Sequence, residues 1–152
     1  MKRLAALLLL LFLLPLPAAA EDPPQYVADF VNEYNSCCPE YAVPPLPIDG
    51  WHYNGAHYTV KRDDYSFSID YFADTYLAMV TVPIENGNMD FFAVCACMSA
   101  AVRGNTPDNY ADILTAYFAL RNMPDERITH KSLGGMTIMQ QTDDILFFGV
   151  TN

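Results

Sequence analysis

A continuous apolar stretch near the middle of the chain, residues 88–104, limits the folds that this sequence can adopt. Asn88 is a suitable N-cap, and Arg103 followed by Gly104 is typical of a helix end. Apolar residues recur between these ends at helical spacing, with small residues on the other side: Phe91, Val94, Cys95, Met98 and Val102. A helix that is apolar on all sides must be buried, so we expect both halves of the chain to pack against it, with Met98 fully buried.

Helix and strand patterns flank this stretch on both sides. Gln25–Asn35 predicts a short amphipathic helix that Cys37-Cys38-Pro39 ends, and the proline-rich segment 41–50 is expected to run extended over the surface. Alternation and turn residues predict strands and one more helix, in this order: strands His57–Arg62, Tyr65–Phe72 and Thr75–Val82, helix Pro107–Arg121 after the central helix, then strands Arg127–Leu133, Met136–Thr142 and Ile145–Thr151. The fold class is therefore α+β: an N-terminal helix, a three-strand antiparallel meander, two helices of which the first is buried, and a second three-strand meander, with the helices packed on the sheet.

This order of elements, with its leading helix, resembles the general plan of secretion-chaperone-like α/β domains. The resemblance is architectural, since it rests on no motif, and it carries over no residue. It implies a partner-binding domain as one alternative for the function.

The first 20 residues have the three parts of a secretory signal peptide. Lys2 and Arg3 precede an apolar run at 4–14, and Ala18–Ala20 offers a small-residue cleavage site. The rival interpretation is an uncleaved membrane anchor, but the run is shorter than the roughly 20 residues that a span needs. We expect cleavage after Ala20 and a secreted or periplasmic (extracytoplasmic) protein that does not associate with the membrane afterwards.

The remaining chain is long enough for one domain with one core. We assign 1–20 to the signal peptide, 21–50 to the N-terminal helix and proline-rich linker, and 51–152 to a single α+β domain packed with that helix. Without Lys2 and Arg3 the chain keeps 6 basic against 18 acidic residues, a net charge of −12. Such a surface repels nucleic acid, so the predicted partner is an unknown protein or small ligand.

The chain contains four cysteines: Cys37, Cys38, Cys95 and Cys97. Because we expect export to an oxidising compartment, disulfides are favoured. A vicinal bridge is strained, and the two cysteines of C-x-C point about 200° apart on a helix. We therefore expect at least one bridge from Cys37 or Cys38 to Cys95 or Cys97, with the exact pairing open. A thiolate site for a soft ion such as Cu(I) is the alternative, although no C-x-x-C is present.

No motif for catalysis or for a cofactor is found. The sequence contains no G-x-S-x-G, P-loop, Rossmann glycine pattern, H-E-x-x-H or EF-hand loop. His130 and Ser132 face the same side of one predicted strand, but such pairs are common, and we assign no triad. His52 and His57 match no metal motif, and Ser99 is interpreted as a small packing residue of the central helix. Aspartates at the predicted hairpin tips are explained by turn chemistry: Asp63, Asp64, Asp74, Asp143 and Asp144. We name no catalytic or metal-ligating residue and no cofactor.

Two classes of function remain. A non-catalytic binding or interaction module should show an exposed aromatic patch, for which Tyr41, Trp51 and Tyr53 beside the proline-rich linker are the candidates. A small extracellular hydrolase should instead gather His57 or His130 with a carboxylate in a cleft. The missing motifs favour the interaction module, so we lean against an enzyme.

Overall fold

The computed structural model describes residues 22–83, 89–122, 127–132, 135–142 and 144–152. The signal peptide and the predicted N-cap Asn88 lie outside these residues. Helices and strands follow one another in this order: α2 (Gln25–Tyr41), β1 (His52–Tyr53), β2 (Tyr58–Arg62), β3 (Tyr65–Phe72), β4 (Thr75–Pro83), α3 (Met89–Arg103), α4 (Pro107–Asn122), β5 (Arg127–Ser132), β6 (Gly135–Gln141) and β7 (Ile145–Thr151).

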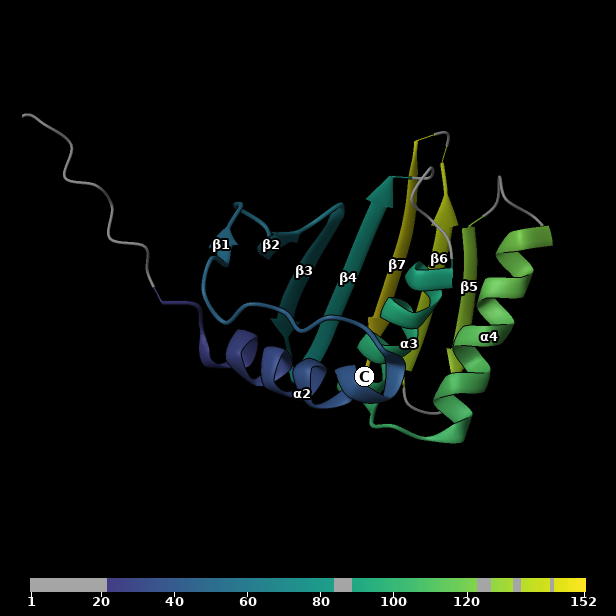
Figure 1. Ribbon diagram of the computed structural model, residues 1–152, viewed down its shortest axis with the longest axis horizontal. Coiled ribbons are helices and arrows are strands. Elements are labelled where there is room, and N and C mark those ends of the chain that lie inside the picture. The colour runs from purple at the N-terminus through teal and green to yellow at the C-terminus, as the bar shows by residue number, and fades with distance from the viewer. Residues whose placement is uncertain (1–21, 84–88, 123–126, 133–134, 143) are drawn as a thin grey trace, which may run out of the picture.

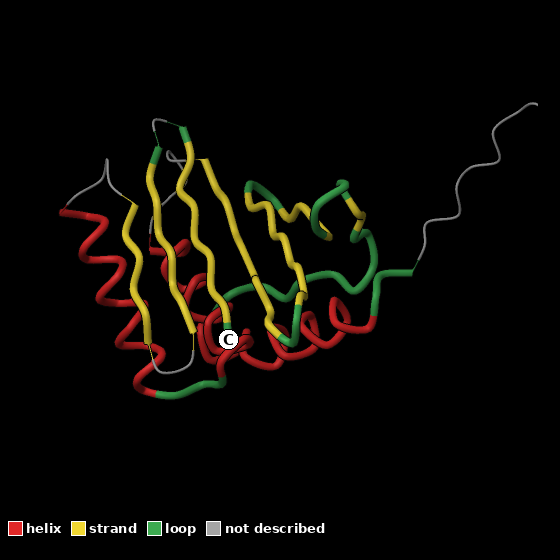
Figure 2. The backbone as a smooth tube through the Cα atoms, turned by 180° about the vertical axis from the view of Figure 1, so that it is seen from behind, coloured by secondary structure: helices red, strands yellow, loops and turns green. Residues whose placement is uncertain are grey.

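The strands form one antiparallel sheet in the order β1-β2-β3-β4-β7-β6-β5, and the fold class is α+β as the sequence predicts. The two meanders join because the last strand of each, β4 and β7, pair over residues 77–83 and 145–151. Helices α2, α3 and α4 lie on one face of this sheet, whereas the view from behind shows the strands in front of them (Figures 1 and 2). The sheet therefore has one helix-covered face and one open face.

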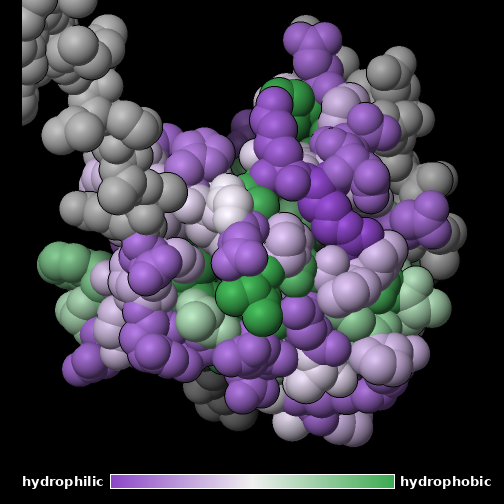
Figure 3. Space-filling model, turned by 60° about the vertical axis from the view of Figure 1, so that its left-hand side comes forward, coloured by the Kyte–Doolittle hydropathy of each residue, from purple (hydrophilic) through white to green (hydrophobic). Residues whose placement is uncertain are grey.

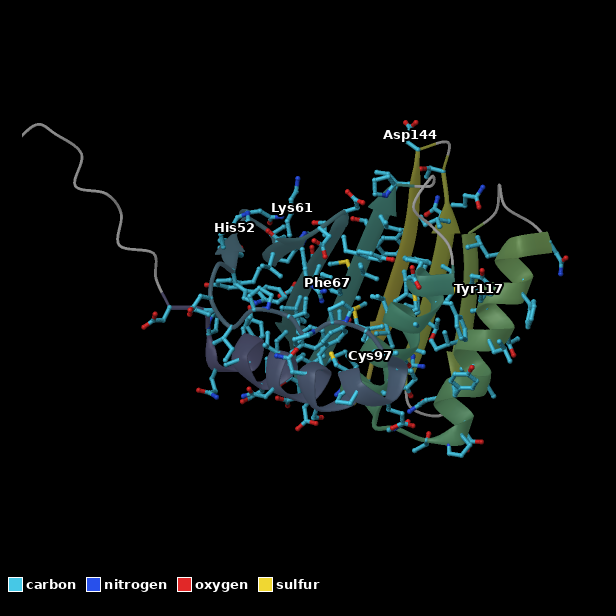
Figure 4. The ribbon with its side chains drawn as sticks, viewed as in Figure 1. His52, Lys61, Phe67, Cys97, Tyr117 and Asp144 are labelled. Carbon is cyan, nitrogen blue, oxygen red and sulfur yellow. The ribbon has the colours of Figure 1, made fainter. Side chains whose placement is uncertain are left out.

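The core lies between the sheet and the helices. Helix α3 is almost wholly buried, with Met98, Cys95 and Cys97 at 0% exposure, as an all-round apolar helix must be. Alternate strand residues such as Phe67 and Val80 meet it from the sheet. Figure 4 shows Phe67 directed inward from β3 and Tyr117 between α4 and the strands.

The prediction that Cys37-Cys38-Pro39 ends the first helix is wrong, because α2 continues through Pro39 to Tyr41. The helix ends at Ala42, whose left-handed φ of 53° lets the following amide of Val43 donate to the Cys38 carbonyl oxygen at 3.2 Å. The last turn is retained since Cys38 is buried against the core, so packing outweighs the loss of one helical hydrogen bond at proline.

The proline-rich segment is irregular, as predicted, but part of it is buried. Val43 and Leu46 are 8% and 2% exposed. The side chain of Asn35 accepts from the Leu46 amide at 2.7 Å and donates to the Leu46 carbonyl at 2.9 Å. The guanidinium of Arg62 donates to the carbonyl of Pro45 at 3.0 Å and to that of Pro44. These bonds tie the segment to α2 and β2.

Candidate interaction surface

The predicted patch of Tyr41, Trp51 and Tyr53 does not form one exposed surface. Trp51 is only 4% exposed, because its ring packs edge-on against Phe30 and its Nε1–H donates to the Pro47 carbonyl at 3.0 Å. Tyr41 is half-buried and its hydroxyl donates to Asn105 Oδ1 at 2.9 Å. Tyr53 alone is largely exposed, at 58%.

Tyr53 instead belongs to a group of five tyrosines, here called the tyrosine cluster, that joins α2, β1, β2, β3 and β4. Successive rings contact one another, with these centroid distances: Tyr53–Tyr58 5.3 Å, Tyr58–Tyr26 6.1 Å, Tyr26–Tyr71 5.6 Å and Tyr71–Tyr76 4.7 Å. Tyr53 at one end of the row is 58% exposed, and Tyr71, next to the other end, is 38% exposed, whereas Tyr76 at that end is half-buried. Phe72, next to Tyr71, is 80% exposed. The cluster is thus a half-buried row in which Tyr53 and Tyr71 are the exposed members.

Two hairpins build the cluster. Tyr53 pairs with Tyr58 across β1 and β2, and Tyr71 pairs with Tyr76 across β3 and β4. Directly opposed aromatic residues on antiparallel strands attract each other, so each hairpin brings its own pair together. Tyr26 in the first turn of α2 lies between the two pairs. A sequence signal existed, because each tyrosine pair flanks a turn, but nothing local links the two hairpins.

Carboxylates border the cluster. The Tyr71 hydroxyl donates to Asp74 Oδ1 at 3.1 Å, and this bond is the main reason that the pKa of Tyr71 is raised. Burial, followed by the charge of Asp29, raises the pKa of Tyr76. A small pocket of about 90 Å³ beside Tyr76 is lined in part by Asp29 and Glu33. Figure 3 brings this side of the molecule forward and shows a mainly hydrophilic surface with separate hydrophobic patches.

Two larger cavities lie near the end of α2. One of 670 Å³ extends to Asn105 and Tyr110, and one of 380 Å³ extends to Arg62 and Asp90. Both are lined by Tyr41 and Ala93. Burial, and then the neighbouring Glu40, raise the pKa of Tyr41 to about 12, so its hydroxyl stays protonated at neutral pH. These cavities and the small pocket have no histidine or serine among their lining residues.

The four cysteines are free thiols in this structure, and two of them lie together. Cys38 Sγ of α2 and Cys97 Sγ of α3 donate to the same carbonyl oxygen, that of Tyr34, at 3.3 and 3.5 Å. Burial, and after it the neighbouring Cys38 thiol, raise the pKa of Cys97. Cys37 is half-buried, and Cys95 is fully buried on α3. Of the four pairings left open by the sequence, the structure brings together Cys38 and Cys97, which share the Tyr34 carbonyl oxygen. Figure 4 shows Cys97 on the side of α3 that meets α2.

The remaining sequence candidates lie apart. His52 is exposed on β1, with Nε2 3.0 Å from Thr59 Oγ1, and His57 follows the Asn54-Gly55 turn. Asp144 lies at a hairpin tip (Figure 4), whereas Asp143 and the side chains of His130 and Ser132 lie outside the described part. Within the described residues, no three histidine, cysteine, aspartate or glutamate side chains converge as a metal site would require.

Comparisons with known proteins gave no relative. No protein-family model matches the chain, and no curated protein or solved structure matches it either. In the part of the chain that the structure describes, no helix combines the length and the apolar character needed to cross a membrane.

Proposed function

We propose that the chain is an exported, non-catalytic interaction module that binds a basic polypeptide segment through the tyrosine cluster. The observation that carries the proposal is the continuous row of five ring-contacting tyrosines, of which Tyr53 and Tyr71 are exposed to solvent. Tyrosine is enriched where proteins bind one another, because its ring supplies contact area and its hydroxyl remains satisfied by water or a partner.

The charge around the cluster favours a cationic partner. The hydroxyl of Tyr71 is bonded to the Asp74 carboxylate, and the charge of Asp29 acts on Tyr76. Guanidinium and ammonium groups bind tyrosine faces through the ring quadrupole and gain further from nearby carboxylates. The whole chain after residue 20 carries a net charge of −12, which also speeds the approach of a basic segment.

Calorimetric titration with a short peptide carrying three arginines separated by glycine and serine tests the proposal. We expect binding that weakens ~5–30-fold in the Tyr53→Ala/Tyr71→Ala double variant, since two exposed cation–π contacts contribute ~1–2 kcal/mol. Phe118→Ala is the matched control, because Phe118 on α4 is exposed to the same extent as Tyr53, at 57%, and should leave binding unchanged.

The same peptide with citrulline in place of arginine separates charge from shape. Citrulline keeps the planar head group but loses the positive charge, so it should bind much more weakly than arginine. Equal binding of the parent and the double tyrosine variant would show that bulk negative charge attracts the peptide and that the cluster is not its site.

Export and cleavage after Ala20 are part of the proposal. The Lys2-Arg3 start, the apolar run and the alanine site support it. Expression of the full sequence, followed by intact-mass measurement of the exported protein, should give a chain that begins at Glu21. A product that keeps residues 1–20 and stays in the membrane fraction would contradict export.

A further inference from the structure

The cavity of 380 Å³ near the end of α2 is a second candidate site. Three segments meet there: the end of α2 with the following residues 42–44, the hairpin of β2 and β3, and the first turns of α3. Its volume falls in the range of roughly 300–1,000 Å³ that is typical of small-ligand pockets. The described residues that line it include none of the five tyrosines of the tyrosine cluster, so the two sites are separate.

The walls of this cavity are largely apolar. Phe67 of β3 and Val94 of α3 are 2% and 5% exposed, and Val43 of the proline-rich segment also lines it. The Tyr65 ring, whose centroid lies 6.2 Å from that of Phe67, extends the aromatic part of the wall. Such walls accept an aliphatic or aromatic group and remove it from water.

Arg62 brings positive charge to the cavity. Its side chain is only 19% exposed, and its Nη1 donates to the carbonyl oxygens of Pro44 and Pro45. Its Nη2 lies 3.7 Å from Asp63 Oδ2, which is longer than a hydrogen bond, and the Asp63 side chain is 79% exposed. Carbonyl oxygens carry no net charge and an exposed ion pair is weak, so Nη2 and Nε can bind a ligand carboxylate in the two-bond geometry that arginine favours.

Asp90 brings negative charge to the same cavity. It lies in the first turn of α3 and lines the cavity together with Arg62 and Tyr65. Burial, and then the charge of Asp90, raise the pKa of Tyr65, whereas the charge of Arg62 acts in the opposite direction. Both charged groups are therefore close to the Tyr65 side chain. The cavity combines one cation, one anion and an apolar wall.

We propose that this cavity binds an α-amino acid with an apolar side chain. Arg62 binds the ligand carboxylate, Asp90 binds the ligand ammonium, and the apolar wall contacts the ligand side chain. A ligand with a carboxylate alone would be repelled by Asp90, and one with an amine alone would be repelled by Arg62. An amino acid satisfies both groups with charge-assisted hydrogen bonds. The site goes beyond the proposed function, because it uses none of the residues of the tyrosine cluster.

Calorimetric titration of the purified protein with L-phenylalanine and with L-leucine tests the proposal. We expect saturable binding to one site. L-phenylalaninamide lacks the carboxylate and N-acetyl-L-phenylalanine lacks the ammonium, so each should bind at least tenfold more weakly than L-phenylalanine. If the amide bound as tightly as the amino acid, Arg62 would not be the carboxylate ligand and the proposal would be overturned.

Two variants locate the ligand. Asp90→Asn should weaken L-phenylalanine at least tenfold but should not weaken N-acetyl-L-phenylalanine, which has no ammonium group. Glu40→Gln is the matched control, because it makes the same change of charge in the lining of the neighbouring 670 Å³ cavity, and it should leave binding unchanged. The Tyr53→Ala/Tyr71→Ala variant should also bind L-phenylalanine normally, so a failure of this site can be distinguished from a failure of the tyrosine cluster.

Thermal unfolding of each variant checks the fold, which Asp90→Asn should retain because Asp90 is exposed. A parent protein that binds neither amino acid would overturn the proposal. Binding that Asp90→Asn leaves unchanged, or that Glu40→Gln weakens equally, would place the ligand outside this cavity and would also overturn it.

Discussion

The two faces of the sheet are made by alternate residues of the same strands, yet they differ in what covers them. On the helix-covered face, Phe67, Ile69 and Val80 are 2% exposed or less, and α3 closes over them. On the open face their strand neighbours Ser66, Ser68 and Met79 remain partly exposed. The comparison teaches that one face carries the stability of the monomer, whereas the other is free to carry an interaction.

The helix-covered side also contains thiol and hydroxyl groups that are buried away from water. The thiols of Cys38 and Cys97 lie between α2 and α3, and burial raises the pKa of both. The hydroxyl of Ser99 is buried there and has no hydrogen-bond partner among the described residues.

Two methionines provide the largest contrast. Met98→Asp places a charge at a site on α3 with 0% exposure and should prevent folding, because an unpaired buried charge costs about 4–5 kcal/mol or more. Met79→Asp, on the open face, should cost only about 1–2 kcal/mol in the monomer. Chemical denaturation at a concentration where the protein is monomeric measures both. Equal losses would show that the open face is as closely packed as the covered one.

A disulfide between Cys38 and Cys97 is the next largest effect. Oxidation by a small disulfide such as oxidised glutathione should join these two residues, with both electrons and protons passing to the glutathione. The bridge closes a loop of about 60 residues and should add ~2–4 kcal/mol to the free energy of unfolding. Peptide mapping without reduction identifies the pair. Linkage of Cys37 to Cys38 alone, or four free thiols after oxidation, would contradict the prediction.

Alkaline pH should weaken the reduced protein. Burial keeps Cys95 and Cys97 protonated in the folded state by raising the pKa of each thiol. In the unfolded chain the same thiols ionise above about pH 8.5, so the folded state then binds more protons and loses stability as pH rises. The expected loss is up to about 1.4 kcal/mol per pH unit for each thiol. Denaturation at several pH values measures the slope, which Cys97→Ala should reduce.

The smallest effect concerns Ser99 on α3. Since its buried hydroxyl has no partner within the described residues, Ser99→Ala should leave stability unchanged or raise it by up to about 1 kcal/mol. Thr81→Ala on the open face is the comparison, because water reaches Thr81 and its change should lie within about 0.5 kcal/mol. A loss above about 1 kcal/mol in Ser99→Ala would mean that the hydroxyl has a bonding partner.

Helices and strands whose residue pattern is local could be predicted from the sequence. Strands Tyr65–Phe72 and Ile145–Thr151 were predicted with their observed bounds, and the central helix begins and ends within one residue of its predicted range. Alternation and helical spacing follow from the backbone geometry of each segment, so they can be seen without the rest of the chain.

The contacts between segments far apart in the chain could not be predicted in this way. The pairing of β4 with β7 joins the two meanders into one sheet. Helix α2 continues past Pro39, and Trp51 is buried in the core. The tyrosine cluster and the pair of Cys38 with Cys97 likewise come from segments far apart in the chain. The physical reason is that these contacts depend on the total apolar surface that the whole chain buries on folding. A local sequence pattern does not determine this total.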